Sequence, residues 1–395
     1  MLHDFEGHGD RSTLLAPLKL DRDSMPRLRT LRLRFEQIQV TLSSNIFSGL
    51  TTLEVRDALC WKTWEMPTLI SCMREWTQLE TLNLWWSLPE ANITQYPVTR
   101  PKNTVTFPKL RRLDLGDMTL YADHFLRHLE LHPGTSVHFD GEWHNGLHPA
   151  DYSDVFRSLV SSISAEVLKP IRGLTIRNGS GDIEVYGFLE SELELLGKAE
   201  LGSGIRGSLY LFLQVDFDLD EEEVEVDLDV DPNEPRIQAC QILSTISGVL
   251  SVRELEVLRV QLHNQPEFLE WEPILRPIDN VKKVIIDSHR IGTSRFLDAL
   301  AGSTYESTDG WEPVLPRLEE LVITFIIQYH DYDIPFDNVL QFHKSRLARG
   351  VPIQTLVLED RRRRPATKDE VIEELARLSA VPGVDVVWKL EVDDD

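Results

Sequence analysis

The chain has 395 residues, of which 42% are hydrophobic and 8% aromatic, so it resembles a folded protein with a large core rather than a disordered chain. Its 41 Lys and Arg residues against 65 Asp and Glu residues give a net charge of −24, which argues against binding to nucleic-acid phosphates. Three cysteines without a Cys-x-x-Cys pair exclude a disulfide framework, and no stretch is long and apolar enough for a membrane helix. The composition therefore predicts an intracellular protein, cytoplasmic or nuclear, with no nucleic acid and no membrane as partner.

The first predicted element is a cap or flexible segment over residues 1–24, where leucines are mixed with charged residues. After it, a short pattern of the form apolar-x-x-apolar-x-apolar recurs along residues 25–392. Nine copies are visible, and they begin at Leu28, Leu50, Leu79, Leu110, Ile171, Leu255, Val281, Leu318 and Ile353. Degenerate copies near Val137 and Leu209 raise the expected number of repeats to about eleven.

Between these strand-like copies the apolar residues adopt the spacing of a helix. We expect helices around residues 66–73, 122–129 and 152–163. Two later helices carry terminal signals: Asp337 is expected to cap a helix that stops at Gly350, and Thr367 with Glu370 forms a capping-box pattern. The chain therefore alternates between strand and helix.

Such alternation is also typical of doubly wound sheets and barrels, so the faces of the strands decide between these folds. Strands covered on both faces are continuously apolar, whereas here Arg32 and Arg34 alternate with Leu31 and Leu33. Ile285 and Val322, at positions expected to be open, fit this pattern less well. We predict an α/β leucine-rich-repeat solenoid, a horseshoe with a parallel sheet on its concave face and helices on its convex face.

The polar strand positions are the candidate protein-binding residues of this concave face. They are Arg32, Arg34, Arg56, Trp85, Asp114, Arg177 and Arg259. Trp85 follows the inward-facing Leu84, so alternation turns it outward, where an aromatic side chain is suited to binding. Packing of Trp85 against a neighbouring repeat is the competing interpretation.

Sequence motifs give little support for catalysis. His124, His128 and His132 have helical spacing, and six histidines lie between His124 and His148, so a metal-dependent enzyme is the least favoured alternative. The glycine motif that begins at Gly202 precedes an expected strand at Leu209, although a dinucleotide site requires a helix there. We predict a non-enzymatic protein without a catalytic residue, cofactor or metal.

Two charged runs stand apart from the repeats. Residues 214–235 form an acidic insert, because 216–234 hold eleven acidic residues and no basic residue, and it is interpreted as a loop or as an edge strand. Arg361 to Arg364 form a basic run that resembles a nuclear-import patch or a solvated loop. Residues 393–395 form an acidic tail.

Three segments carry a resemblance to a known family. They are Phe107-Pro-Lys-Leu-Arg-Arg-Leu-Asp-Leu115, Leu315-Pro-Arg-Leu-Glu-Glu-Leu-Val-Ile323, and the run from Arg349-Gly-Val-Pro-Ile-Gln-Thr-Leu356 to Val387-Trp388. Over residues 25–392 the chain resembles the substrate-binding part of fungal, basidiomycete-type F-box proteins with irregular leucine-rich repeats.

The resemblance implies a substrate-recognition role in an F-box-type ubiquitin ligase receptor. An F-box is a helical module ahead of the repeats, and only 24 residues precede Met25 here. We therefore expect a protein substrate as partner, and a ligase adaptor only if an F-box is present upstream. The alternative is a leucine-rich-repeat scaffold unconnected to ubiquitination.

Overall fold

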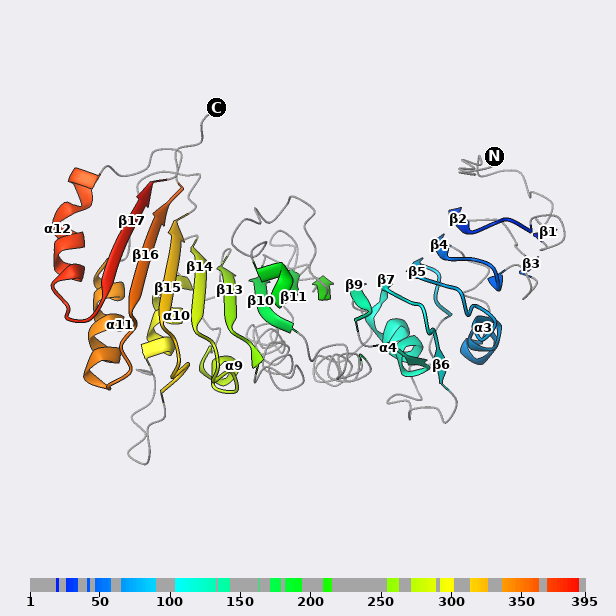
Figure 1. The fold of residues 1–395 in the computed structure, drawn as a ribbon, viewed down its shortest axis with the longest axis horizontal. Helices are drawn as coiled ribbons and strands as arrows, with labels where there is room; N and C mark the ends of the chain where they lie inside the picture. Colours follow the sequence, from blue (N-terminus) through cyan, green and yellow to red (C-terminus); the bar gives the residue numbers. More distant parts are fainter. Residues whose placement is uncertain are drawn as a thin grey trace, which may run out of the picture. The chain divides into compact units, whose positions relative to one another are not determined.

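The computed structural model describes residues 19–20, 26–34, 41–42, 47–57, 65–89, 104–132, 134–142, 163, 171–178, 182–193, 209–214, 254–262, 271–288, 292–301, 313–325, 336–361 and 368–390. These residues form a mixed α/β structure with parallel sheets, and the described strands close no barrel (Figure 1). The chain divides into two compact units: an N-terminal unit of residues 1–170 and 206–216, and a C-terminal unit of residues 171–205 and 217–395. The assignment of residues 25–392 to a single repeat domain stays a prediction.

A parallel sheet forms the N-terminal unit. Its strands lie in the order β2 (Thr30–Arg34), β4 (Thr52–Arg56), β5 (Thr81–Trp85), β7 (Arg112–Met118), β9 (Ser136–Glu142) and β12 (Leu209–Gln214). Two short parallel pairs accompany it: β1 (Lys19–Leu20) with β3 (Thr41–Leu42), and β6 (Val105–Thr106) with β8 (Leu129–Glu130). The helices are α3 (Met66–Met73) and α4 (Thr119–Arg127), and α4 contacts β7 and β9.

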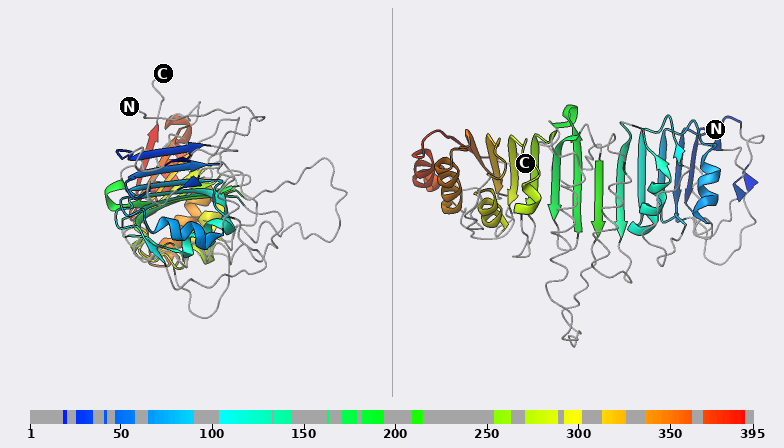
Figure 2. Two further views of the ribbon diagram at one scale, coloured as in Figure 1. Left: turned by 90° about the vertical axis from the view of Figure 1, so that its right-hand side faces the viewer. Right: turned by 90° about the horizontal axis from the view of Figure 1, so that it is seen from below.

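The C-terminal unit has a similar sheet. Its strands lie in the order β11 (Asp182–Leu189), β10 (Ile171–Asn178), β13 (Val257–Leu262), β14 (Lys283–Ser288), β15 (Glu320–Phe325), β16 (Thr355–Asp360) and β17 (Asp385–Leu390). The other elements are the 3-10 turn η2 (Glu190–Glu192) and the helices α9 (Glu272–Leu275), α10 (Gly292–Ala301), α11 (Phe336–Ala348) and α12 (Lys368–Ser379). Helix α10 contacts β14, and α12 contacts β17 (Figure 2).

The N-terminal sheet buries one of its two faces. In the N-terminal unit the inward positions Leu53, Val55, Leu82 and Leu84 are completely buried, and Leu113 follows them in β7. Alternate residues of a strand point to opposite faces, so the polar residues between these leucines lie on the other face. All nine pattern copies, and both degenerate ones, coincide with strands as predicted.

A repeated set of backbone hydrogen bonds joins successive strands at their starts. The carbonyl of Arg29 accepts the N–H groups of Thr51 and Thr52 at 2.8 and 3.1 Å, and the carbonyl of Thr51 accepts those of Glu80 and Thr81. In the C-terminal unit the carbonyls of Glu256, Lys282 and Glu319 each accept two N–H groups from the start of the next strand in the same way. We call this arrangement the strand-start ladder.

A tight turn with two buried apolar ends precedes many of the strands. In each turn the fourth residue donates its N–H to the carbonyl of the first, and the pairs are Phe47 with Leu50, Trp76 with Leu79, Phe107 with Leu110, Leu275 with Ile278, Leu315 with Leu318, and Leu378 with Val381. The turn anchors the chain in the core just before the strand begins.

The structure departs from the predictions at three elements. Strand β11 was not predicted: it runs antiparallel to β10, because only four residues separate the paired Asn178 and Ile183, too few for a parallel crossover. Helix α4 ends at Arg127, so the predicted helical residue Leu129 lies in β8 instead.

The third departure is at helix α11. Asp337 lies within its first turn and is not the residue ahead of it, so the predicted cap is wrong, and its carboxylate accepts a hydrogen bond from Arg377 at 2.7 Å. The predicted stop at Gly350 is confirmed. Gly350 has a φ of +76°, and the N–H of Val351 donates to the carbonyl of Arg346, as in a Schellman motif.

Other predictions fall where the structure gives no description. The predicted helix over residues 152–163, apart from Ile163, lies outside the described residues, as do the glycine motif at Gly202, Thr367, the acidic insert beyond Gln214, and the tail at 393–395. None of the described helices is both long and apolar enough to cross a membrane.

Candidate protein-binding face

Strand pairing places the predicted binding residues at outward positions. Across the N-terminal unit one row of paired residues runs Arg32, Glu54, Asn83, Asp114 and His138. The next row runs Arg34, Arg56, Trp85, Gly116 and Asp140. Five predicted residues, Arg32, Arg34, Arg56, Trp85 and Asp114, therefore share one face, which we call the N-terminal polar face.

The remaining two predicted residues belong to the C-terminal unit. Arg259 of β13 is paired with Thr175 and Ile285, and Arg177 of β10 is paired with Gln261. The backbone of Arg177 is described, but its side chain lies outside the described part of the chain. The two residues therefore belong to a separate unit and are described apart from the N-terminal polar face.

Arginine side chains dominate the edge of the N-terminal polar face. The Nε atoms of Arg32 and Arg56 lie 3.3 and 2.8 Å from the two carboxylate oxygens of Glu54, so one acid holds two arginines. The arginine side chains remain 57% and 41% exposed, and Arg34 is also exposed. Surface ion pairs of this kind add little stability, about 0–1 kcal/mol, but they orient the guanidinium groups.

Trp85 lies flat on the neighbouring strand. A Cβ atom placed on Gly116 of β7 would lie 2.4 Å from the Trp85 ring, so the absence of a side chain at Gly116 makes room for the indole. The guanidinium carbon of Arg56 lies 5.5 Å from the centre of the same ring, within reach of a cation–π interaction. Trp85 is partly exposed on the outward face and also packs against the neighbouring strand, and its role in binding stays a prediction.

Asp114 and Arg259 correct the expectation that all the predicted residues are exposed. Asp114 is only 4% exposed, because Arg112 Nε and His138 Nδ1 each lie 2.8 Å from its carboxylate. Arg259 is 5% exposed, with its Nε 2.6 Å from Asp287. Both side chains neutralise neighbours within their sheets and leave little surface for a partner.

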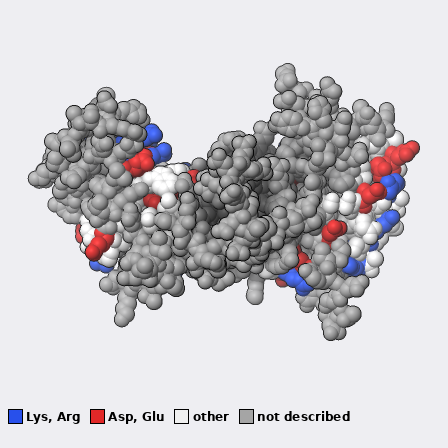
Figure 3. Space-filling model, turned by 180° about the vertical axis from the view of Figure 1, so that it is seen from behind, with Lys and Arg blue, Asp and Glu red and all other residues white. Residues whose placement is uncertain are grey.

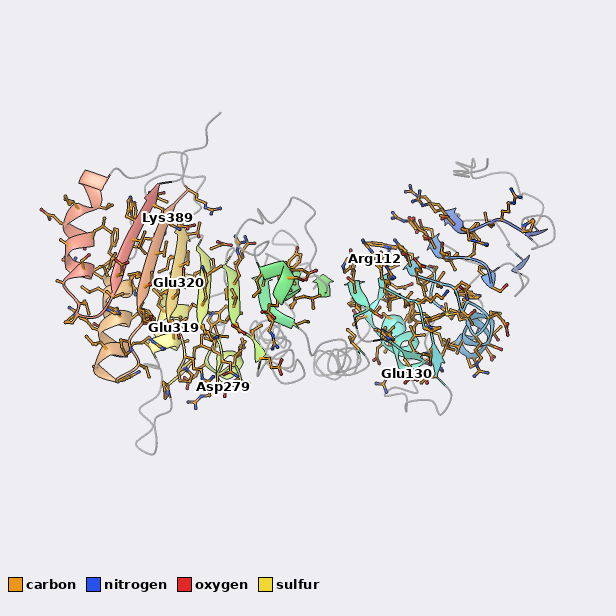
Figure 4. The ribbon with its side chains drawn as sticks, in the orientation of Figure 1. Arg112, Glu130, Asp279, Glu319, Glu320 and Lys389 are labelled. Atoms are coloured by element: carbon orange, nitrogen blue, oxygen red, sulfur yellow. The ribbon has the colours of Figure 1, made fainter. Side chains whose placement is uncertain are left out.

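The charge of Asp114 is held in place by its neighbours. Burial alone would raise the pKa of Asp114, but hydrogen bonds from His138 and Arg112, together with their charges, keep this pKa below its ordinary value. The ring of His138 also lies within hydrogen-bonding distance of the Ser136 hydroxyl, at 3.1 Å. The carboxylate therefore stays ionised and pairs with Arg112, which remains 48% exposed and is labelled in Figure 4.

The corresponding face of the C-terminal unit is more apolar. Ile285, Val322 and Val357 are paired across β14, β15 and β16, and all are less than 10% exposed. Ile285 and Val322 of this row are the residues that fitted the predicted polar face less well in the sequence.

A charged row follows beside this apolar row. Glu359 accepts hydrogen bonds from Arg361 and Lys389, both at 3.1 Å, and Figure 4 labels Lys389 on β17. Burial by itself would raise the pKa of Glu359. The hydrogen bonds and charges of Lys389 and Arg361 outweigh burial, so the pKa lies below its ordinary value. Arg361, the one described residue of the predicted basic run, is therefore partly buried in an ion pair.

The predicted binding residues did not include three residues of the N-terminal polar face: Glu54, Arg112 and Gly116. The signal was available for Glu54 and Arg112, since both occupy outward positions of strands that the pattern located. The role of Gly116 depends on the Trp85 ring, 31 positions earlier, and no local pattern reveals it.

The histidine cluster does not assemble as the spacing suggested. His124 and His128 lie close, with ring centres 5.4 Å apart, but His132 follows β8 and is exposed, so the three do not share one helix. Burial lowers the pKa of both His124 and His128, that of His128 to about 4. No group of three His, Cys, Asp or Glu side chains among the described residues is arranged to hold a metal ion, and His144 and His148 lie outside them.

Comparison with known proteins adds no assignment. No protein-family model matches the chain, and no curated protein or solved structure is similar enough to count as a match.

Proposed function

We propose that the chain is a leucine-rich-repeat solenoid that binds another protein and catalyses no reaction. The strand-start ladder supports the repeat architecture, because the same backbone contacts recur in both units at every step from Arg29 to Arg111 and from Glu256 to Gln354. Parallel strands with one apolar and one polar face are the arrangement that repeat solenoids use to present a binding surface. The horseshoe, with a concave sheet, belongs to this proposal.

The observation that carries the function is the composition of the N-terminal polar face. It combines a partly exposed tryptophan with exposed arginines, and these two residue types are enriched where protein interfaces concentrate their binding energy. The proposed function requires no metal and no cofactor. It also involves no contact with nucleic acid or membrane.

By its resemblance to fungal F-box proteins, the chain would be the substrate-recognition part of a ubiquitin ligase receptor inside the cell. The assignment to a ubiquitin ligase receptor depends on the sequence segments around Phe107, Leu315 and Arg349. A scaffold unconnected to ubiquitin uses the same face and differs only in the proteins attached to it. The ligase adaptor would be a partner only if an F-box precedes the repeats.

The test is affinity purification of tagged chain from the source cells, followed by mass spectrometry, for wild type and for Trp85→Ala. The variant should lose most of a specific partner while its melting temperature changes little, since Trp85 is partly exposed. Recovery of ligase subunits would support the receptor, and recovery of other partners would support the scaffold. An unchanged set of partners with Trp85→Ala, at unchanged yield, would refute binding through this face.

A further inference from the structure

Four arginines share the N-terminal polar face with Trp85: Arg34 and Arg56 lie in its row, and Arg32 and Arg112 lie two and four residues earlier along their strands. Arg32 and Arg34 belong to β2, Arg56 to β4 and Arg112 to β7, and Trp85 lies on β5 between them in the sheet order β2-β4-β5-β7. We call these four residues the arginine patch. Neighbouring strands are about 4.8 Å apart and a strand rises about 3.3 Å per residue, so the patch extends about 15 Å across the strands and about 13 Å along them.

The acidic residues of these strands do not cancel the patch. Glu54 and Asp114 are the acidic residues at outward positions of β2, β4, β5 and β7, so the local balance is 4 − 2 = +2, whereas the whole chain carries −24. Asp114 is buried and ionised between Arg112 and His138, and Glu54 lies between two arginines. The most exposed charges of these strands are therefore guanidinium groups, since the side chains of Glu54 and Asp114 are only 23% and 6% exposed.

The charge of the patch contrasts with its surroundings. Asp140 ends the second row at β9 and limits the patch on that side. On the face drawn in Figure 3, described Lys and Arg side chains lie close to described Asp and Glu side chains. At about 0.15 M salt, charges separated by more than about 8 Å are largely screened, so the patch, rather than the net charge, decides which peptide is attracted.

We propose that the arginine patch binds an acidic segment of the partner protein, in an extended conformation across β2 to β7. Its Asp or Glu carboxylates would accept paired hydrogen bonds from the planar guanidinium groups, which match carboxylate geometry. One apolar side chain of the segment would rest on Trp85, whose ring is held between Gly116 and Arg56. The inference rests on the proposed function, because it names the chemistry of a partner that the same face would bind.

The test measures fluorescence anisotropy of labelled twelve-residue peptides with the full chain. One peptide alternates Glu with Ser around a central Leu, and two others have Gln or Lys in place of Glu. The binding variant is Arg34→Glu/Arg56→Glu. The control is Arg74→Glu/Arg317→Glu, which changes the net charge equally at exposed residues away from the sheet faces.

The Glu peptide should bind more tightly than the Gln peptide, and added salt should weaken it. The binding variant should weaken it at least tenfold, roughly what two charged contacts supply, while the control stays within about twofold. Circular dichroism melts establish that all variants fold. Tighter binding of the Lys peptide, equal binding of the Glu and Gln peptides, or equal losses in the two double variants would overturn the inference.

Failure here is distinguishable from failure of the proposed function. If the Glu peptide does not bind, but the captured partner still disappears with Arg34→Glu/Arg56→Glu, the face binds a protein of different chemistry and only the acidic segment is refuted. If the captured partner also persists, the face is not the binding site.

Discussion

At the scale of single residues, Trp85 and Gly116 form the most specific contact of the polar face. The Trp85 ring occupies the space that a side chain at Gly116 would need. Gly116→Ala should therefore destabilise the protein by about 1–3 kcal/mol, the usual cost of forcing extra atoms into a packed site.

The double variant Trp85→Ala/Gly116→Ala tests whether the contact with Trp85 causes the loss of stability. In the Trp85→Ala background the same Gly116→Ala change should cost nothing, because the ring is gone and alanine restricts the unfolded chain more than glycine does. Urea unfolding of the four proteins measures the coupling. An equal cost in both backgrounds would show that the strain at Gly116 comes from another neighbour.

His128 predicts a pH dependence of stability. Burial, helped by the neighbouring His124, lowers the pKa of His128 from 6.5 to about 4. The unfolded chain takes up a proton near pH 6.5, whereas the folded chain resists it until about pH 4. The part of the free energy of unfolding that depends on neutral His128 is fully present above pH 6.5 and is lost as pH falls from 6.5 to 4. Solvent screening keeps this loss below the roughly 3 kcal/mol that the whole shift would give.

The comparison is between thermal melts of wild type and His128→Gln from pH 7.5 to 4. Glutamine takes up no proton, so the variant should lose less stability over this window, while the carboxylates affect both proteins alike. Parallel curves would mean that His128 is protonated as readily in the folded protein as in the unfolded chain.

At the scale of elements, one buried arginine ties helix α11 to its surroundings. Arg346 is 1% exposed, and its guanidinium donates hydrogen bonds to the carbonyls of Val351, Val314 and Leu315 at 2.9 to 3.0 Å and to that of Leu300 at 3.4 Å. Burial lowers the pKa of Arg346 to about 10, which still leaves it charged at neutral pH. The side chain thereby joins α11, the end of α10 and the turn before β15.

Arg346→Lys should cost about 3 kcal/mol or more, because an ammonium group cannot reach carbonyls arranged around a planar fork and leaves some of them unsatisfied. The control is Arg349→Lys, three residues later and exposed, which should change stability by less than about 0.5 kcal/mol. Chemical denaturation compares the two. Equal effects would show that the four carbonyls do not depend on the guanidinium.

At the scale of the whole molecule, a repeat array should respond to damage locally. Leu113 of β7 and Leu356 of β16 are completely buried, each in a different unit. Replacing either by Asp puts a carboxylate where a buried leucine is worth about 2–5 kcal/mol. Because each repeat of the proposed array would contact mainly its neighbours, hydrogen exchange should rise mostly in the unit that carries the change.

Ile372→Asp is the matched control, since Ile372 of α12 is 52% exposed and the same kind of substitution should do little there. Hydrogen exchange measured by mass spectrometry after each substitution distinguishes a local response from a response of the whole molecule. A uniform rise over both units for Leu113→Asp and for Leu356→Asp would contradict the repeat array and indicate one cooperative core.

The sequence by itself located the strands and their buried faces. The alternation of Leu31 and Leu33 with Arg32 and Arg34 is local, and a shift of one residue would put every leucine into water, so the register follows from the pattern. The same reasoning placed Arg32, Arg34, Arg56, Trp85 and Asp114 on one face. It missed β11, although the Asn-Gly-Ser-Gly segment after Arg177 is a turn signal that demands an antiparallel neighbour.

Only the tertiary structure decided which outward residues remain accessible. Asp114 is buried because His138, 24 positions later, lies beside it in the next strand, and Arg259 is buried because Asp287 does the same 28 positions later. Trp85 has room because residue 116 is glycine, and Arg346 is a buried anchor because four carbonyls from three separate segments converge on it. Alternation along a strand sets the direction of a side chain, but its exposure depends on neighbours that the chain supplies from elsewhere.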